Sequence, residues 1–122
     1  NAAASAGEDI QEVKGVKLLT TALAKIEINE LRNLGDSLLQ KTEGGVAVLA
    51  SADEAHVNLL VMVGKEAEQR GANAGKLIKA IAPLIGGGGG GRPNIAQAGG
   101  KNPAGVQAAL AKAAEALAEE LA

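Results

Sequence analysis

The chain has 122 residues, 47% hydrophobic and 21% charged, with a formal net charge of −2, which fits one domain with a modest core and excludes a multidomain enzyme. It lacks Phe, Tyr, Trp and Cys and has one His, which excludes disulfides, thiolate or multi-histidine metal sites, and aromatic platforms for unpaired bases. No apolar run approaches the ~18 residues that a membrane span needs, and no signal segment opens the chain, so we expect a cytoplasmic protein without membrane contact.

The first third of the chain predicts a lead-in, a strand and a helix. Residues 1–12 are rich in Ala and acidic side chains and look like a lead-in or the remnant of a preceding helical segment, so we place the domain at residues 13–122. After Gly15, the apolar stretch 16–23 predicts a buried strand. From about residue 27 to 41, apolar residues recur every three or four positions, which predicts an amphipathic helix.

The middle of the chain predicts a β-hairpin followed by a short helix. Residues 46–50 and 57–63 are apolar strands joined by the polar turn 51–55. Asn73 is expected to cap a helix that ends or kinks at Pro83.

The last helix is expected from Pro103 to about Leu121, with Asn102 as its N-cap. The predicted order is therefore β-α-β-β-α-loop-α. We expect an α/β fold in which a small sheet of about three strands, built from one crossover and one hairpin, is covered by three helices.

Six consecutive glycines, residues 86–91, are the most informative feature. Each costs roughly 0.5–1 kcal/mol relative to Ala in a regular element, so we interpret the run as a loop that bends freely or approaches another molecule, with no packing requirement behind it. Pro93 restricts Arg92 to an extended backbone, and Lys101 lies beside the expected N-terminus of the last helix. Cations, free N–H groups and a helix dipole together predict an anion-binding segment.

The charge distribution supports this interpretation. Residues 65–101 hold six basic side chains and two acidic ones, although the whole chain is acidic. The candidate nucleic-acid-binding residues are Gly86, Gly87, Gly88, Gly89, Gly90, Gly91, Arg92, Asn94, Gln97, Lys101, Lys76 and Lys79.

Other interpretations of these motifs are weaker. Phosphate-binding and dinucleotide-binding glycine loops follow a strand, whereas these glycines follow a predicted helix; a flexible linker stays an alternative. His56 beside Asp53 and Glu54 is typical of a solvated turn, and no serine has a histidine near it in sequence. We therefore predict no catalytic residue and no metal site.

The string from Ile85 to Lys101 resembles the signature of the DHH-associated domain family, in the form found at the C-terminus of bacterial alanyl-tRNA synthetase. The preceding residues 75–84 and the opening residues 15–17 resemble this family too, so the resemblance covers roughly residues 12–121. Members commonly carry Asp and Met where this chain has Asn94 and Ile95.

The resemblance implies a noncatalytic module that binds the outer corner of the L-shaped tRNA and helps to couple aminoacylation with editing of mischarged tRNA. It implies alanine-specific tRNA and the other domains of the same ligase as partners, with a possible homodimer in the parent protein. This fragment would hold no cofactor; ATP, magnesium and zinc would belong to the rest of the parent enzyme.

Two alternatives stay open. The same domain type accompanies DHH-family phosphoesterases, where it helps to hold nucleotides or short oligonucleotides. A purely structural or dimerising role would use the alanine-rich last helix.

Overall fold

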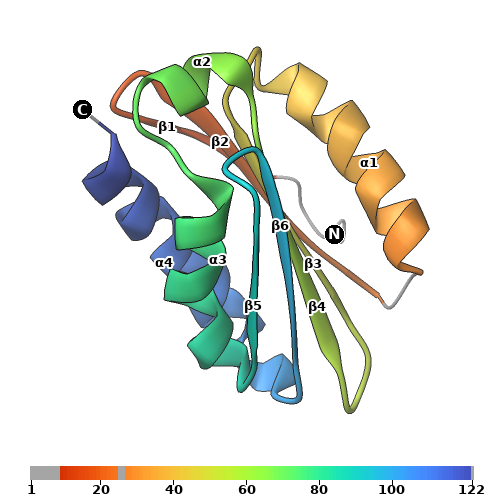
Figure 1. Ribbon diagram of the computed structural model, residues 1–122. Helices are drawn as coiled ribbons and strands as arrows, with labels where there is room; N and C mark the ends of the chain where they lie inside the picture. Colours follow the sequence, from red (N-terminus) through yellow and green to blue (C-terminus); the bar gives the residue numbers. More distant parts are fainter. Residues whose placement is uncertain (1–8, 25–26, 122) are drawn as a thin grey trace.

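The computed structural model describes residues 9–24 and 27–121, which form a sheet with helices on both faces (Figure 1). The strands are β1 (Asp9–Val13), β2 (Val16–Ala24), β3 (Val46–Ala52), β4 (Val57–Val63), β5 (Gly88–Gly91) and β6 (Ile95–Gly100). The helices are α1 (Ile28–Lys41), α2 (Lys65–Gln69), α3 (Ala74–Ile81) and α4 (Val106–Glu120). Two 3-10 turns, Ala82–Ile85 and Pro103–Gly105, follow α3 and precede α4.

The strand order across the sheet is β1-β2-β3-β4-β6-β5. β2 and β3 run parallel and are connected through α1, because two parallel neighbours cannot be joined by a tight turn. The other neighbouring pairs are antiparallel. The glycine strand β5 therefore forms one edge of the sheet and β1 forms the other.

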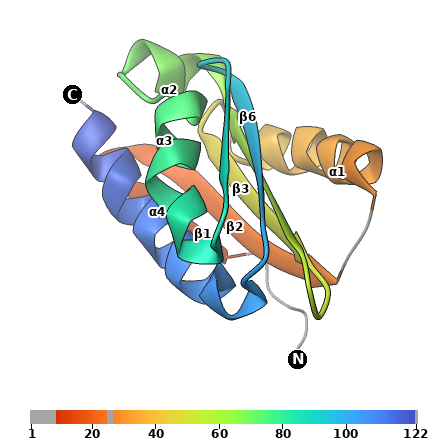
Figure 2. The ribbon, with the colours of Figure 1, turned by 60° about the horizontal axis from the view of Figure 1, so that its bottom comes forward.

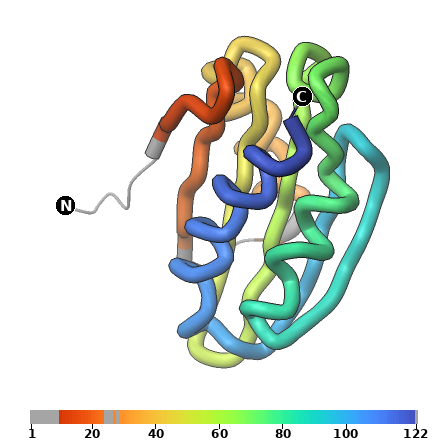
Figure 3. Tube along the Cα trace, turned by 90° about the vertical axis from the view of Figure 1, so that its left-hand side faces the viewer, coloured from red at the N-terminus to blue at the C-terminus, as the bar shows by residue number. Residues whose placement is uncertain are grey.

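Helices cover the two faces of the sheet unequally. α1 packs on β3 and β4 on one face, while α3 and α4 lie side by side on the other (Figures 2 and 3). β3 shows the consequence, since Val46, Val48 and Ala50 join the large core under α3 and α4, and Ala47 and Leu49 join the smaller core under α1. Burial on both faces explains why β3 and β4 are almost continuously apolar.

Several predictions from the sequence are confirmed. The buried strand after Gly15, the amphipathic helix and the central antiparallel hairpin are β2, α1 and the β3–β4 pair. Asn73 caps α3, because its Oδ1 accepts the backbone N–H of Lys76 at 3.0 Å. α3 ends two residues before Pro83, where the 3-10 turn takes over.

The predicted sheet of three strands under three helices is wrong. The described residues contain six strands and four helices, because the prediction missed β1, β5, β6 and α2. Residues 9–12, which were placed in the lead-in, belong to β1, and residues 1–8 lie outside the described part of the chain. β1 is mostly polar, β5 is all glycine and β6 is mostly Ala and Gly, so these three strands lack the β-branched pattern by which strands are identified.

The start of the last helix also differs from the prediction. Asn102 makes no side-chain capping hydrogen bond, and Pro103 opens a 3-10 turn, so α4 begins only at Val106. An anion site at this helix N-terminus therefore lacks the expected local geometry.

Candidate nucleic-acid interface

The glycine run forms a strand in place of the expected loop. Gly88 to Gly91 pair with Gly99 to Ala96 of β6 in an antiparallel hairpin. Arg92, Pro93 and Asn94 make the connecting turn, which closes where the Arg92 N–H donates to the Ile95 carbonyl at 2.8 Å. The ribbon in Figure 1 shows β5 as the outermost strand, between β6 and α3. The run is mostly exposed, so its backbone is available to another molecule.

Packing does explain alternate glycines, which corrects the expectation that it explains none. A Cβ on Gly89 would lie 2.5 Å from the Cα of Ala98, and one on Gly91 would lie 2.6 Å from the Cα of Ala96. Gly87 meets β6 in the same way, at the carbonyl of Gly99. These three positions require glycine because β6 runs too close for any side chain.

The even-numbered glycines of β5 are different. A Cβ on Gly88 would meet no atom within 4 Å, and one on Gly90 would meet only the Cε of Lys79 at 3.9 Å. Neither has a positive φ. The fold therefore tolerates a side chain at Gly88. Within the described residues, neither packing nor backbone conformation explains why this position is glycine.

The turn of the hairpin is held by its backbone and presents its side chains to solvent. The Asn94 carbonyl accepts the N–H of Val63 at 2.9 Å, and the Pro93 carbonyl accepts the N–H of Ala74 at 2.8 Å. These bonds anchor the turn to β4 and α3. Arg92 and Asn94 are both exposed, and the Arg92 side chain has no hydrogen-bond or ion-pair partner within the described part of the chain.

The other predicted basic residues do not gather at one point. Lys101 is exposed just after β6, so the six-residue strand separates it from Arg92 by about 20 Å at roughly 3.3 Å per residue. Lys79 projects from α3 toward Gly90, whereas Lys76 lies closer to Glu120 at the end of α4. The cations therefore border the hairpin along its length. Gln97 is exposed in the middle of β6.

A row of shallow hollows follows the hairpin and adds residues that the sequence analysis did not single out for this site. The hollow at the turn end, of about 250 Å³, is lined by Arg32, Gly90, Gly91, Arg92, Ile95, Ala96 and Gln97. The next is lined by Asn58, Gly88, Gln97, Ala98 and Gly99, and the last adds His56, Gly86, Gly87 and Lys101. Asn58 lies at the site because β4 pairs with β6, and Arg32 lies there because α1 packs on β4. No local sequence pattern predicts either contact.

His56 behaves as the sequence suggested. It is exposed, and the Asp53 carboxylate accepts the backbone N–H groups of Ala55 and His56 at 2.8 and 2.7 Å, which makes a compact polar turn. Within residues 9–24 and 27–121, no group of three or more His, Asp or Glu side chains is placed to hold a metal ion.

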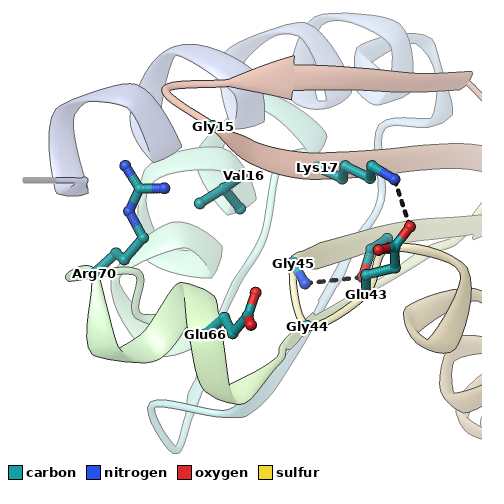
Figure 4. A pocket seen from close by; sticks show the side chains of 9 residues that line it. Gly15, Val16, Lys17, Glu43, Gly44, Gly45, Glu66 and Arg70 are labelled. Atoms are coloured by element: carbon teal, nitrogen blue, oxygen red, sulfur yellow. Dashed lines mark hydrogen bonds and ion pairs between the residues drawn. The ribbon is translucent and has the colours of Figure 1, made fainter.

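A second depression lies where the β1–β2 turn, the α1–β3 loop and α2 meet (Figure 4). Lys17 and Glu43 form an ion pair of 2.7 Å there, and their hydrogen bond raises the pKa of Lys17 and lowers the pKa of Glu43. Arg70 donates to the Lys14 carbonyl at 2.6 Å. Because its cations already have partners, this depression is a poor anion site.

None of the helices in the described residues has both the length and the apolar character to cross a membrane.

Comparison with known proteins gives consistent matches. The DHHA1 domain family matches residues 15–119. Alanine–tRNA ligase 1 of Lachnoclostridium phytofermentans is 57% identical over 104 residues, covering 85% of this chain and 12% of the relative. The alanine–tRNA ligase of Lacticaseibacillus paracasei is 50% identical over 112 residues, covering 92% of this chain and 13% of the relative. The chain thus spans only 12–13% of the length of these relatives.

Solved structures share the fold. The C-Ala domain from Aquifex aeolicus alanyl-tRNA synthetase superposes with a TM-score of 0.82 at 34% identity, covering 90% of this chain and 98% of that domain. A DHH-domain structure described as a member of the s1p family of ribosomal proteins covers 94% of this chain and 28% of its own, with a TM-score of 0.65. Its identity is 15%, so this likeness concerns the fold alone.

Proposed function

Because the chain belongs to the DHHA1 domain family, and within it to the C-Ala domains of alanyl-tRNA synthetase, we propose that it is a noncatalytic tRNA-binding module of such a synthetase. The observation that carries the proposal is the β5–β6 hairpin, an exposed edge with almost no side chains, bordered along its length by cations.

This edge suits folded RNA better than single strands. Unpaired bases are held mainly by stacking on aromatic side chains, and the chain contains none. A bare backbone surface can lie against an exposed base pair at the outer corner of tRNA, while Arg92, Lys79 and Lys101 neutralise nearby phosphates. Recognition would then depend on the shape of the tRNA more than on its sequence.

In this proposal the module catalyses nothing alone. It holds alanine-specific tRNA while other domains of the parent ligase carry out aminoacylation and editing in the cytoplasm, and it helps to couple the two reactions. ATP, magnesium and zinc would be bound by those other domains.

The test is a mobility-shift titration of the chain with tRNA(Ala) and with an RNA duplex of equal length. Tighter binding to tRNA supports the proposal, and equal or absent binding contradicts it. Replacing Arg92 with Ala should reduce the magnitude of the log–log salt slope by about one if the guanidinium contacts a phosphate. Lys112→Ala is the matched control, because Lys112 is a basic residue of α4 paired with Glu115 at 3.8 Å, outside the hollows.

The alternative, left open by the sequence analysis, is a substrate-holding domain of a DHH-family phosphoesterase. It predicts that a mononucleotide or short oligonucleotide competes with tRNA at comparable concentration. A competition titration with AMP and a short oligonucleotide separates the two functions.

A further inference from the structure

The structure leaves one face of the hairpin without a helix. α1 packs mainly on β3 and β4, and Ile95 at the start of β6 packs against the core beneath α1, so the rest of the hairpin lies beside α1 and not under it. The row of hollows follows the hairpin, and its lining combines glycine backbone with the side chains of Asn58, Ile95 and Gln97. A ligand that docks on this face would also contact the side of α1, which forms one wall of the hollow at the turn end.

Arg32 is the basic residue that α1 contributes to this wall. It lines the same hollow as Arg92, although 60 positions separate the two in the chain. Both side chains are exposed, and neither has a hydrogen-bond or ion-pair partner within residues 9–24 and 27–121. Two guanidinium groups from separate elements therefore border one hollow without a carboxylate between them.

This arrangement fits a phosphate. Like charges in one hollow repel, and an anion between them removes the repulsion and receives charge-assisted hydrogen bonds from both planar forks. The floor at Gly90 and Gly91 has no side chains to keep the anion away, and the Gln97 amide lies beside it. A phosphate diester of an RNA backbone has the charge and size for this position.

We propose that Arg32 and Arg92 together bind one backbone phosphate of the RNA, and that the face of the hairpin beside α1 is the docking face. This rests on the proposed function, because it assigns the contact within the same tRNA site. It makes Arg32 a binding residue that the sequence analysis did not single out.

The experiment is a tRNA titration at several salt concentrations with Arg32→Ala, Arg92→Ala, the double variant and the control Lys112→Ala. Each arginine variant should weaken binding roughly tenfold, because a charge-assisted hydrogen bond is lost. Because both arginines neutralise the same phosphate, the double variant should reduce the magnitude of the salt slope by about one in total, whereas two independent phosphate contacts would reduce it by about two. Lys112→Ala should match the wild type. Arg32 is exposed, so thermal melts should show all variants folded.

The outcomes separate the two proposals. If Arg92→Ala weakens binding and Arg32→Ala does not, the docking face is wrong while the tRNA-binding function stands. If the wild type does not prefer tRNA over duplex, the proposed function fails. In that case the Nε–H resonance of Arg32 is followed by NMR while inorganic phosphate is added: a saturable shift shared with Arg92 supports the paired site, and no shift overturns it.

Discussion

The carboxylate of Glu120, the last residue of α4, accepts the backbone N–H of Asn73 at 2.7 Å, and Asn73 in turn caps α3. Glu120 therefore fastens the end of α4 to the beginning of α3. This contact matters for the hairpin because α3 packs directly against β5. Burial raises the pKa of Glu120, while the Asn73 N–H and Lys76 act in the opposite direction.

This raised pKa predicts the pH dependence of Glu120→Gln. A carboxyl whose pKa is higher in the folded state favours folding most at low pH, and that contribution is lost as pH rises from about 4.5 through the folded pKa. Gln keeps an oxygen to accept the Asn73 N–H but never ionises. We expect the melting temperature of Glu120→Gln, relative to that of the wild type, to increase as pH rises through this window. Thermal melts from pH 4 to 8 measure this difference.

The matched control is Glu119→Gln, which removes an exposed carboxylate from the same turn. If both variants change the melting temperature in parallel at every pH, burial does not raise the pKa of Glu120 in the folded state. Glu120→Ala should be less stable than Glu120→Gln, because the Asn73 N–H then loses its acceptor.

Alternate glycines of β5 should respond oppositely to Ala. Gly89→Ala places a Cβ against the backbone of β6 and should destabilise the fold by about 1–3 kcal/mol. Gly88→Ala meets open space and should stay within ~0.5 kcal/mol of the wild type. Urea denaturation measures both, and equal losses would show that β5 does not pair with β6 in this register.

The turn between β1 and β2 should accept Asn in place of Lys14. Lys14 and Gly15 have φ of 50° and 85°, the pattern of a type I′ turn that favours Asn-Gly. Lys14→Asn should raise stability by a few tenths to about 1 kcal/mol, despite losing a long hydrogen bond of 3.5 Å to the Leu121 carbonyl. Thermal melts test this, with Lys14→Val as the control, since a β-branched residue at positive φ should lower the melting temperature.

The buried hydroxyl of Thr42 secures the end of α1. It donates to the Leu39 carbonyl at 2.5 Å and accepts the Gly45 N–H at 3.0 Å. Thr42→Val should cost about 1–2 kcal/mol because both bonds disappear in a buried place. Thr42→Ser retains the hydroxyl and should lose less in the same urea titration; a serine variant as weak as valine would assign the effect to the methyl group.

The central elements could be predicted because their signals are local. Leu31, Leu34 and Leu38 repeat at helical spacing in α1, and the apolar runs of β3 and β4 flank a polar turn. Asn73 marks the start of α3, and Pro83 lies just beyond its end, in the 3-10 turn. The family was also recognisable, because the Gly-Arg-Pro string is contiguous.

The edge strands and half of the candidate site could not be predicted in this way. Gly88 to Gly91 have no side chains, so they carry no period, and they become a strand only through hydrogen bonds to β6. Arg32 lies near the hairpin because α1 packs on β3 and β4, and β4 is the strand that pairs with β6. The sequence by itself determined the chemistry available, which is an aliphatic core, a bare glycine run and a set of cations. Only the tertiary structure decided which cations share a surface, because strand pairing joins residues that local patterns cannot connect.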